Sequence, residues 1–169
     1  MNRILDAWNS MERNDALAAL RSCCAATQWA AQVTDLRPFL NEEAVFAAAD
    51  TVWATMEESD WLEAFRAHPR IGERKPAHAS AQSAAWSQQE QASTSAAQDT
   101  LLAELAENNV RYESLFGFTY IVCATGKSAE EMLAILKRRL SSDRQTELRE
   151  AAEQQRQITQ IRLRKWLQS

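Results

Sequence analysis

Apolar residues recur along this chain every three to four positions, which is the period of an α-helix. The clearest repeats occupy residues 4–11, 17–24, 44–56, 101–110, 132–140 and 143–167. Only three glycines and three prolines interrupt the chain, and a sheet-rich fold needs more turns than that. The pattern therefore predicts an all-α fold: one domain over residues 1–169, built as a bundle of roughly seven to nine helices.

Polar residues at the starts of these repeats predict where several helices begin. Asn14 or Asp15 is expected to cap the second helix. Asp60 is expected to cap a short helix, WLEAFRA, which ends at His68 because a residue before proline is biased away from helical angles. Ser128 opens the capping box SAEE ahead of another helix.

Two stretches depart from the helical period. Residues 69–85 read as one long loop that contains His78, and long loops in compact domains often carry function. A long helix is then expected to start at Ser87. Residues 118–123 are β-branched and aromatic, which favours a strand. Because a lone strand has nothing to pair with, we interpret this stretch as buried helix.

Composition narrows the function classes. The net charge of −4 argues against general nucleic-acid binding, which requires a basic face. No apolar run approaches the length of a membrane span, and the start of the chain lacks the apolar core of a signal peptide, so a cytoplasmic protein is expected. The three cysteines form no CxxC or His/Cys set, so neither a disulfide scaffold nor a zinc site is predicted. They are expected to be small buried residues, with a catalytic thiol as the alternative.

His68 is the first candidate for chemistry, because imidazole is the side chain best suited to proton transfer near neutral pH. The alternative is a histidine that interacts with the C-terminal end of a helix dipole. A single His-Pro pair favours this second interpretation when it is taken alone.

Ser87 and Glu90 are the second candidate. Their S-x-x-E spacing favours a capping box. The functional alternative places a hydroxyl and a carboxylate at a helix N-terminus within reach of His68, where Glu90 orients the imidazole or shares its proton.

Arg162 is the third candidate. On a helical wheel, Ala151, Gln155 and Ile158 bracket it, so its guanidinium lies in the stripe that faces the core. A buried charge must find partners, either an internal acid or an anionic or carbonyl-rich ligand. By contrast, the basic run of residues 137–139 is expected to be mostly solvated, and the six tryptophans to pack the core. No Walker, GxGxxG, HExxH or GxSxG motif is present.

Six stretches spread over nearly the whole chain form a more specific signal as a set. They are SCCAATQWA, LRPF, DWLEAFRAHPRIGER, WSQQEQAS, NNVRYESLFGFTYIVCATGKSAEEML and QITQIRLRKW. Together they resemble the family of 2-oxo-4-hydroxy-4-carboxy-5-ureidoimidazoline (OHCU) decarboxylases of urate breakdown. The resemblance implies an all-α, usually homodimeric carboxy-lyase that needs no cofactor or metal. It implies that OHCU is converted to (S)-allantoin in purine catabolism.

The resemblance also implies residue roles. The family's catalytic histidine matches His68, with Pro69 fixing the turn after it, and its S-x-x-E-Q motif matches Ser87, Glu90 and Gln91. In this interpretation His68, positioned by Glu90, handles the proton, while the substrate itself accepts the electrons left by CO2.

Further residues are implied to bind the substrate. The arginine of a short C-terminal motif matches Arg162, which with Ser87 would anchor ring and ureido oxygens. The family often has proline and phenylalanine where this chain has Thr119 and Tyr120, which leaves the backbone contacts of the pocket open. The implied pocket-lining residues are Phe118, Tyr120, Ile121 and Val122.

Two other classes of function stay open from the residues. One is a helical interaction domain, in which Ser87 and Glu90 only cap a helix and Arg162 only forms an internal ion pair. The other is a hydrolase acting on a different ureido compound, which would release ammonia or urea instead of CO2. An enzyme requires the four polar residues around one cavity, whereas an adaptor does not.

Overall fold

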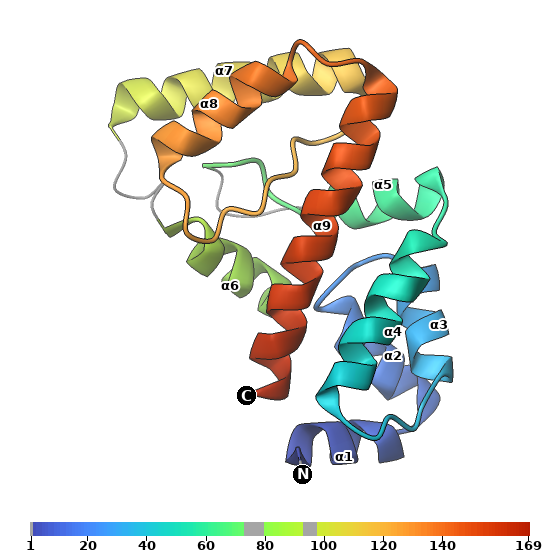
Figure 1. Cartoon of the computed structure of the whole chain (residues 1–169). Coiled ribbons are helices and arrows are strands. Elements are labelled where there is room, and N and C mark those ends of the chain that lie inside the picture. The colour runs from blue at the N-terminus through green and yellow to red at the C-terminus, as the bar shows by residue number, and fades with distance from the viewer. Residues whose placement is uncertain (1, 73–79, 93–97) are drawn as a thin grey trace. The chain divides into compact units, whose positions relative to one another are not determined.

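The structure is a computed structural model that describes residues 2–72, 80–92 and 98–169. Within these ranges it contains nine helices and no strand (Figure 1), which confirms the predicted all-α class. The helices are α1 (Arg3–Ser10), α2 (Arg13–Arg21), α3 (Thr27–Asp35), α4 (Glu42–Ala54), α5 (Glu58–Arg66), α6 (Ala81–Glu90), α7 (Asp99–Phe116), α8 (Ala129–Arg139) and α9 (Arg144–Leu167).

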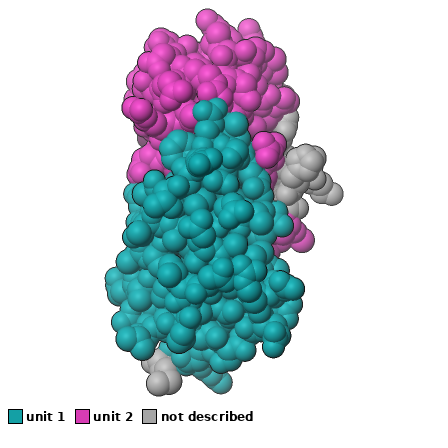
Figure 2. Space-filling model, turned by 90° about the vertical axis from the view of Figure 1, so that its right-hand side faces the viewer, with its two compact units in different colours: residues 1–64, 156–169 teal, residues 65–155 magenta. Residues whose placement is uncertain are grey.

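The chain forms two compact units, coloured separately in Figure 2. Unit 1 comprises residues 1–64 and 156–169, and unit 2 comprises residues 65–155. Helix α9 contributes its first half to unit 2 and its second half to unit 1. The expectation of one domain over the whole chain stays a prediction. No described helix combines the length and apolar character needed to cross a bilayer.

Unit 1 is built around buried tryptophans, as the sequence predicts. Trp8 and Trp29 are both fully buried, and each indole N–H still finds an acceptor. Trp8 donates to the carbonyl of Ala16 at 2.9 Å, and Trp29 donates to the carbonyl of Ala49 at 3.0 Å. Since buried polar groups are costly when unpaired, these bonds let α1 to α4 bury large aromatic surfaces without a polar penalty.

Two predicted helix starts in unit 1 are wrong. Helix α2 begins at Arg13 with Glu12 at the N-cap, so Asn14 and Asp15 lie in its first turn. Asp60 likewise lies in the first turn of α5, where its carboxylate accepts from the backbone N–H of Glu57 at 3.0 Å. Short polar side chains are favourable in a first turn as well as at the cap, so composition alone misplaces the start by a few residues.

Unit 2 has an aromatic core. Tyr112 of α7 lies 4.7 Å from Phe116 and 5.5 Å from Tyr120 between ring centroids, and Phe118 lies 5.6 Å from Phe65 at the end of α5. These rings are all buried, and α7 also packs against α8. The core therefore joins elements that are distant in sequence.

Residues 118–123 do not form the buried helix that we predicted. Gly117, at φ 80°, ends α7 by donating its N–H to Glu113 at 2.8 Å, and the chain then runs without helix to residue 124. Its backbone is satisfied by side chains instead of a second strand. Arg139 donates to the carbonyl of Ile121 at 2.6 Å, and the N–H of Cys123 donates to Gln154 Oε1 at 2.8 Å. This buried, non-helical segment is possible because side chains supply hydrogen bonds that a neighbouring strand would otherwise provide.

The basic run of residues 137–139 is also only partly as predicted. Lys137 and Arg138 are exposed, but Arg139 is 4% exposed and pairs with Glu147, itself 1% exposed, at 2.8 Å. Arg139 is therefore buried on α8, where its guanidinium donates to the carbonyl of Ile121 in the non-helical segment. In contrast, the capping box of Ser128 and Glu131 at the start of α8 is confirmed.

Candidate active site

His68 lies where the structure turns from α5 into the following segment. Helix α5 ends at Arg66, two residues before the predicted end at His68, and the N–H of His68 donates to the carbonyl of Phe65 at 3.1 Å in the closing turn. Pro69, which has no N–H and is buried, follows directly. Because proline disfavours helical angles in the residue before it, the turn delivers a half-buried imidazole to the end of the helix.

Gln155 of α9 contacts this imidazole, and sequence reasoning did not assign it a role. The Nε2 atom of His68 lies 2.7 Å from Oε1 of Gln155, whose side chain is 0% exposed. One signal was available: Gln155 falls in the inward stripe of the last helix, and an inward amide must find a partner. The sequence does not reveal that this partner is His68, because the two residues are 87 positions apart.

Ser87, Glu90 and Gln91 lie at the C-terminal end of a helix, which corrects both interpretations of the S-x-x-E spacing. Helix α6 begins at Ala81, and its N-cap is Ser80, whose hydroxyl accepts from Ser83 N–H at 3.1 Å. Ser87 and Glu90 therefore form no capping box and mark no helix N-terminus. The predicted long helix from Ser87 is also wrong, because α6 ends at Glu90 and a separate helix, α7, begins at Asp99 with Gln98 at its N-cap.

The position of Glu90 is itself informative. Glu90 is the last residue of α6, and Ser87 lies one turn earlier with 2% of its surface exposed. A carboxylate at a helix C-terminus faces the negative end of the helix dipole, which destabilises it by a few tenths to about 1 kcal/mol. Helix stability therefore does not explain the glutamate at this place.

Gln91 joins the end of α6 to the segment that follows His68. Its Oε1 accepts from the N–H of Gly72 at 3.0 Å, and Asn109 of α7 donates to the carbonyl of Ile71 at 3.4 Å. The structure thus brings together, within unit 2, the turn after His68 and the residue after Glu90. Of the predicted loop, residues 73–79, including His78, lie outside the described residues.

The implied pocket-lining residues belong to the same unit. Phe118, Tyr120, Ile121 and Val122 are all buried, and the ring of Phe118 packs on Phe65, three positions before His68. Gln154 holds the backbone of this segment while the adjacent Gln155 contacts His68. One turn of α9 therefore fixes both the histidine and the extended segment.

Arg162 belongs to unit 1, where it is 2% exposed, as the helical wheel predicts. Cys23 and Cys24 lie near its guanidinium. Burial raises the pKa of the Cys23 thiol to about 12 and that of Cys24 to about 11, although the nearby positive charge acts in the opposite direction. Both thiols are therefore protonated at neutral pH and are unsuited to nucleophilic catalysis. The convergence of Arg162 with the other three polar residues stays a prediction.

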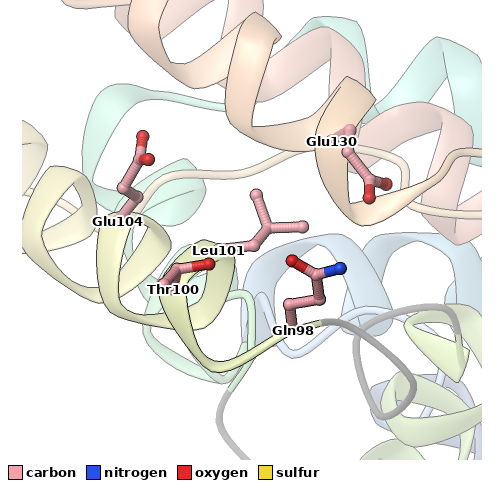
Figure 3. Close-up of a pocket in the computed structure, with 5 residues that line it drawn as sticks. All are labelled: Gln98, Thr100, Leu101, Glu104 and Glu130. Carbon is pink, nitrogen blue, oxygen red and sulfur yellow. The ribbon is translucent and has the colours of Figure 1, made fainter.

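A separate pocket of about 270 Å³ opens between the start of α7 and the start of α8 (Figure 3). It contains none of the predicted site residues and is lined by Gln98, Thr100, Leu101, Glu104 and Glu130. Glu104 is engaged with Lys137 at 2.6 Å. The lining of this pocket contains carboxylates and an amide but no imidazole. The pocket is therefore not an alternative to His68 as a site for proton transfer. Among residues 2–72, 80–92 and 98–169, no group of three or more His, Cys, Asp or Glu is placed to hold a metal ion.

The fold and site define an all-α protein with a fixed histidine at one helix end and a carboxylate at another, a combination suited to proton transfer on a small molecule. Residues 9–164 match the model of the OHCU decarboxylase family. The chain belongs to this family.

Individual relatives agree with this assignment. The chain is 40% identical, over 85% of its length, to the uric acid degradation bifunctional protein TTL of Arabidopsis thaliana. It is 27% identical, over 82% of its length, to the 2-oxo-4-hydroxy-4-carboxy-5-ureidoimidazoline decarboxylase of Amia calva and spans 79% of that protein. A crystal structure of OHCU decarboxylase in the presence of (S)-allantoin is 32% identical, with a TM-score of 0.77 over 94% of this chain and 100% of that one.

The bifunctional relatives are longer than this chain. It spans 44% of the Arabidopsis protein and 31% of a uric acid degradation bifunctional protein from Bacillus.

Proposed function

We propose that this chain is a carboxy-lyase that converts OHCU to (S)-allantoin with release of CO2, in the breakdown of urate. The observation that carries the proposal is the fixed position of His68, at the end of α5 and 2.7 Å from a buried amide, in a chain of the OHCU decarboxylase family. A related structure obtained with (S)-allantoin, the expected product, supports the same substrate class.

The reaction places a clear demand on the protein. When the bond to the carboxylate breaks, its electron pair enters the ring and the ring C=N bond accepts electrons on nitrogen. The hydroxyl group then loses its proton as a carbonyl forms, while the ureido-bearing carbon and the ring nitrogen each gain one. One proton is consumed for each CO2 released. The substrate is thus its own electron sink, and the enzyme must supply a proton relay and fixed donors.

The roles follow from these demands. His68 accepts the hydroxyl proton and delivers a proton to the ureido-bearing carbon on one face, which produces a single enantiomer. Glu90 stabilises the charged imidazolium during this transfer. The residues that bind the substrate are Pro69, Ser87, Gln91, Phe118, Tyr120, Ile121, Val122 and Arg162. Arg162 and Ser87 act as donors that align the departing carboxylate with the ring.

The first prediction concerns His68. The variant His68→Asn should fold but lose at least about 10²-fold in kcat, because general acid–base catalysis contributes roughly this much. Freshly prepared OHCU is added to the protein, and (S)-allantoin formation is followed by circular dichroism while CO2 is measured in parallel. The chain has one other histidine, so His78→Asn serves as the matched control and should keep its activity.

The same assay separates the alternatives. Unchanged enantioselective kinetics in His68→Asn would remove His68 from the mechanism. Release of urea or ammonia instead of CO2 would indicate a hydrolase. A wild-type protein that leaves the spontaneous, racemic decay unchanged would indicate an interaction domain.

The proposal includes a homodimer, as the family resemblance implies, and a cytoplasmic location. Light scattering on the same preparation measures the mass in solution, and a monomeric mass of 19.1 kDa would contradict the dimer.

A further inference from the structure

We propose that Gln155 is a positioning residue that holds the His68 ring with its proton on Nε2, so that Nδ1 is the nitrogen that exchanges protons with the substrate. This inference deepens the proposed decarboxylase function and rests on it. It names a residue outside the family motif that supplies His68, Ser87, Glu90 and Gln91.

The contact fixes the tautomer of the ring. Oε1 of a glutamine is a carbonyl oxygen, which can accept a hydrogen bond but has no proton to donate. At 2.7 Å from Oε1, Nε2 of His68 makes a hydrogen bond with this acceptor when it carries the hydrogen, so the contact favours that tautomer. Because a neutral imidazole has one N–H only, Nδ1 is then its acceptor nitrogen.

Burial makes this arrangement persistent. Gln155 is 0% exposed, so its amide has no access to bulk water as a competing partner. It lies within the long helix α9, and the adjacent Gln154 is engaged with the N–H of Cys123 at 2.8 Å. The ring of His68 is therefore held from a rigid element, as precise catalytic geometry requires.

A neutral amide has a chemical consequence that a carboxylate would not have. A carboxylate at Nε2 would strongly favour the imidazolium and hold the proton on the ring. An amide orients the ring equally well without adding a full negative charge. The proton that Nδ1 accepts from the substrate hydroxyl can then be returned to the ureido-bearing carbon of the substrate in the same turnover. The nitrogen of the substrate ring takes its proton from solvent.

The test uses the small number of histidines. The chain has two, so the imidazole 15N spectrum contains only two ring systems, and His78→Asn assigns them. In the neutral wild-type protein, His68 should show a protonated, pyrrole-type Nε2 and a pyridine-type Nδ1. The variant Gln155→Met, of similar volume but without an acceptor, should lose this tautomer preference. Its kcat should fall by about 10- to 100-fold, with KM changed less, because the imidazole of His68 is misplaced while the substrate still binds in its normal position.

Two further variants separate positioning from simple stability. Gln155→Glu keeps an acceptor oxygen at Nε2 but adds a negative charge, so the ring should keep its proton on Nε2 while the imidazolium is favoured and kcat stays below that of the wild type. Gln145→Met makes the same change as Gln155→Met at an exposed site of α9 and should leave both tautomer and kcat unchanged. Thermal melts followed by circular dichroism establish that each variant is folded.

The inference is overturned if neutral wild-type His68 carries its proton on Nδ1, a measurement that needs no variant. It is also overturned if folded Gln155→Met keeps wild-type kcat. If wild-type protein shows the Nε2–H tautomer but does not decarboxylate OHCU, the proposed function fails while the tautomer assignment stands.

Discussion

Arg139 shows how one residue can connect the stability of unit 2 to the shape of its site. Its guanidinium pairs with Glu147 at 2.8 Å and donates to the carbonyl of Ile121, and the hydroxyl of Tyr112 donates to the same glutamate. Burial opposes the charge of Arg139, but the hydrogen bond that the guanidinium donates to Glu147, together with the charge interactions with Tyr112, Glu147 and Tyr120, outweighs burial, so the pKa of the guanidinium is raised. The ion pair is thus linked to the backbone of the non-helical segment through the carbonyl of Ile121.

Removing this guanidinium should be costly. Arg139→Met leaves Glu147 buried without its cation, so the free energy of unfolding should fall by about 3–5 kcal/mol in urea denaturation. The matched control is Lys137→Met on the same helix, whose partner Glu104 is half exposed. This control should change stability by at most about 1 kcal/mol, as surface ion pairs do. Equal losses in the two variants would contradict a structural role for the buried pair.

At the scale of elements, a complete local signal such as a reciprocal capping box predicts a helix start correctly, whereas a single polar residue does not. Ser128 and Glu131 satisfy each other across one turn, and α8 begins there as expected. The conformation of residues 118–124 cannot be predicted in this way. The partners of its backbone come from α8 and α9, and no local pattern in the sequence reveals them. In α6, the S-x-x-E spacing occurs by coincidence near a helix end, since Ser80 already supplies the cap.

The local signal of α8 is itself measurable. Ser128→Ala removes the acceptor for the N–H of Glu131 and should lower the free energy of unfolding by about 1 kcal/mol. Ser114→Ala is the control, because that hydroxyl is exposed within α7 and only donates to a carbonyl already inside the helix. Denaturant melts of both variants should differ by most of the capping energy. A loss in Ser114→Ala as large as in Ser128→Ala would argue against the cap.

The candidate site shows the same division between local and long-range signals. His68 and Pro69 are predictable because a helix stop before proline is a local event, and Arg162 because the helical wheel gives its face. Gln155 is not predictable as the partner of His68, because only tertiary folding brings α9 to the end of α5.

At the scale of the whole molecule, the two tyrosines of the chain both lie in unit 2, so they give a specific probe of the unfolding of that unit. Burial raises the pKa of both Tyr112 and Tyr120 above the ordinary phenol value of 10.0, so the folded state retains protons that the unfolded state loses. This stabilisation is fully present below pH 10 and is lost as the pH rises above it. Alkaline unfolding should therefore begin above the ordinary phenol pKa.

An absorbance titration checks this. Tyrosinate absorbance at alkaline pH should rise only together with the loss of helical circular dichroism. The variant Tyr120→Phe should show half the absorbance change with the same coincidence. Tyrosinate that appears near pH 10, before any helix is lost, would show that the phenols are accessible in the folded protein.

The three buried cysteines have a practical consequence for spectroscopy. Because Cys23, Cys24 and Cys123 form no disulfide and are shielded from solvent, a single cysteine introduced on the surface should be the only thiol that a maleimide or methanethiosulfonate reagent modifies quickly. Spin labels could then be attached at chosen exposed positions without first removing the native cysteines. A pair of such labels, one in α2 and one in α7, would allow electron paramagnetic resonance to follow distances between the two units during turnover.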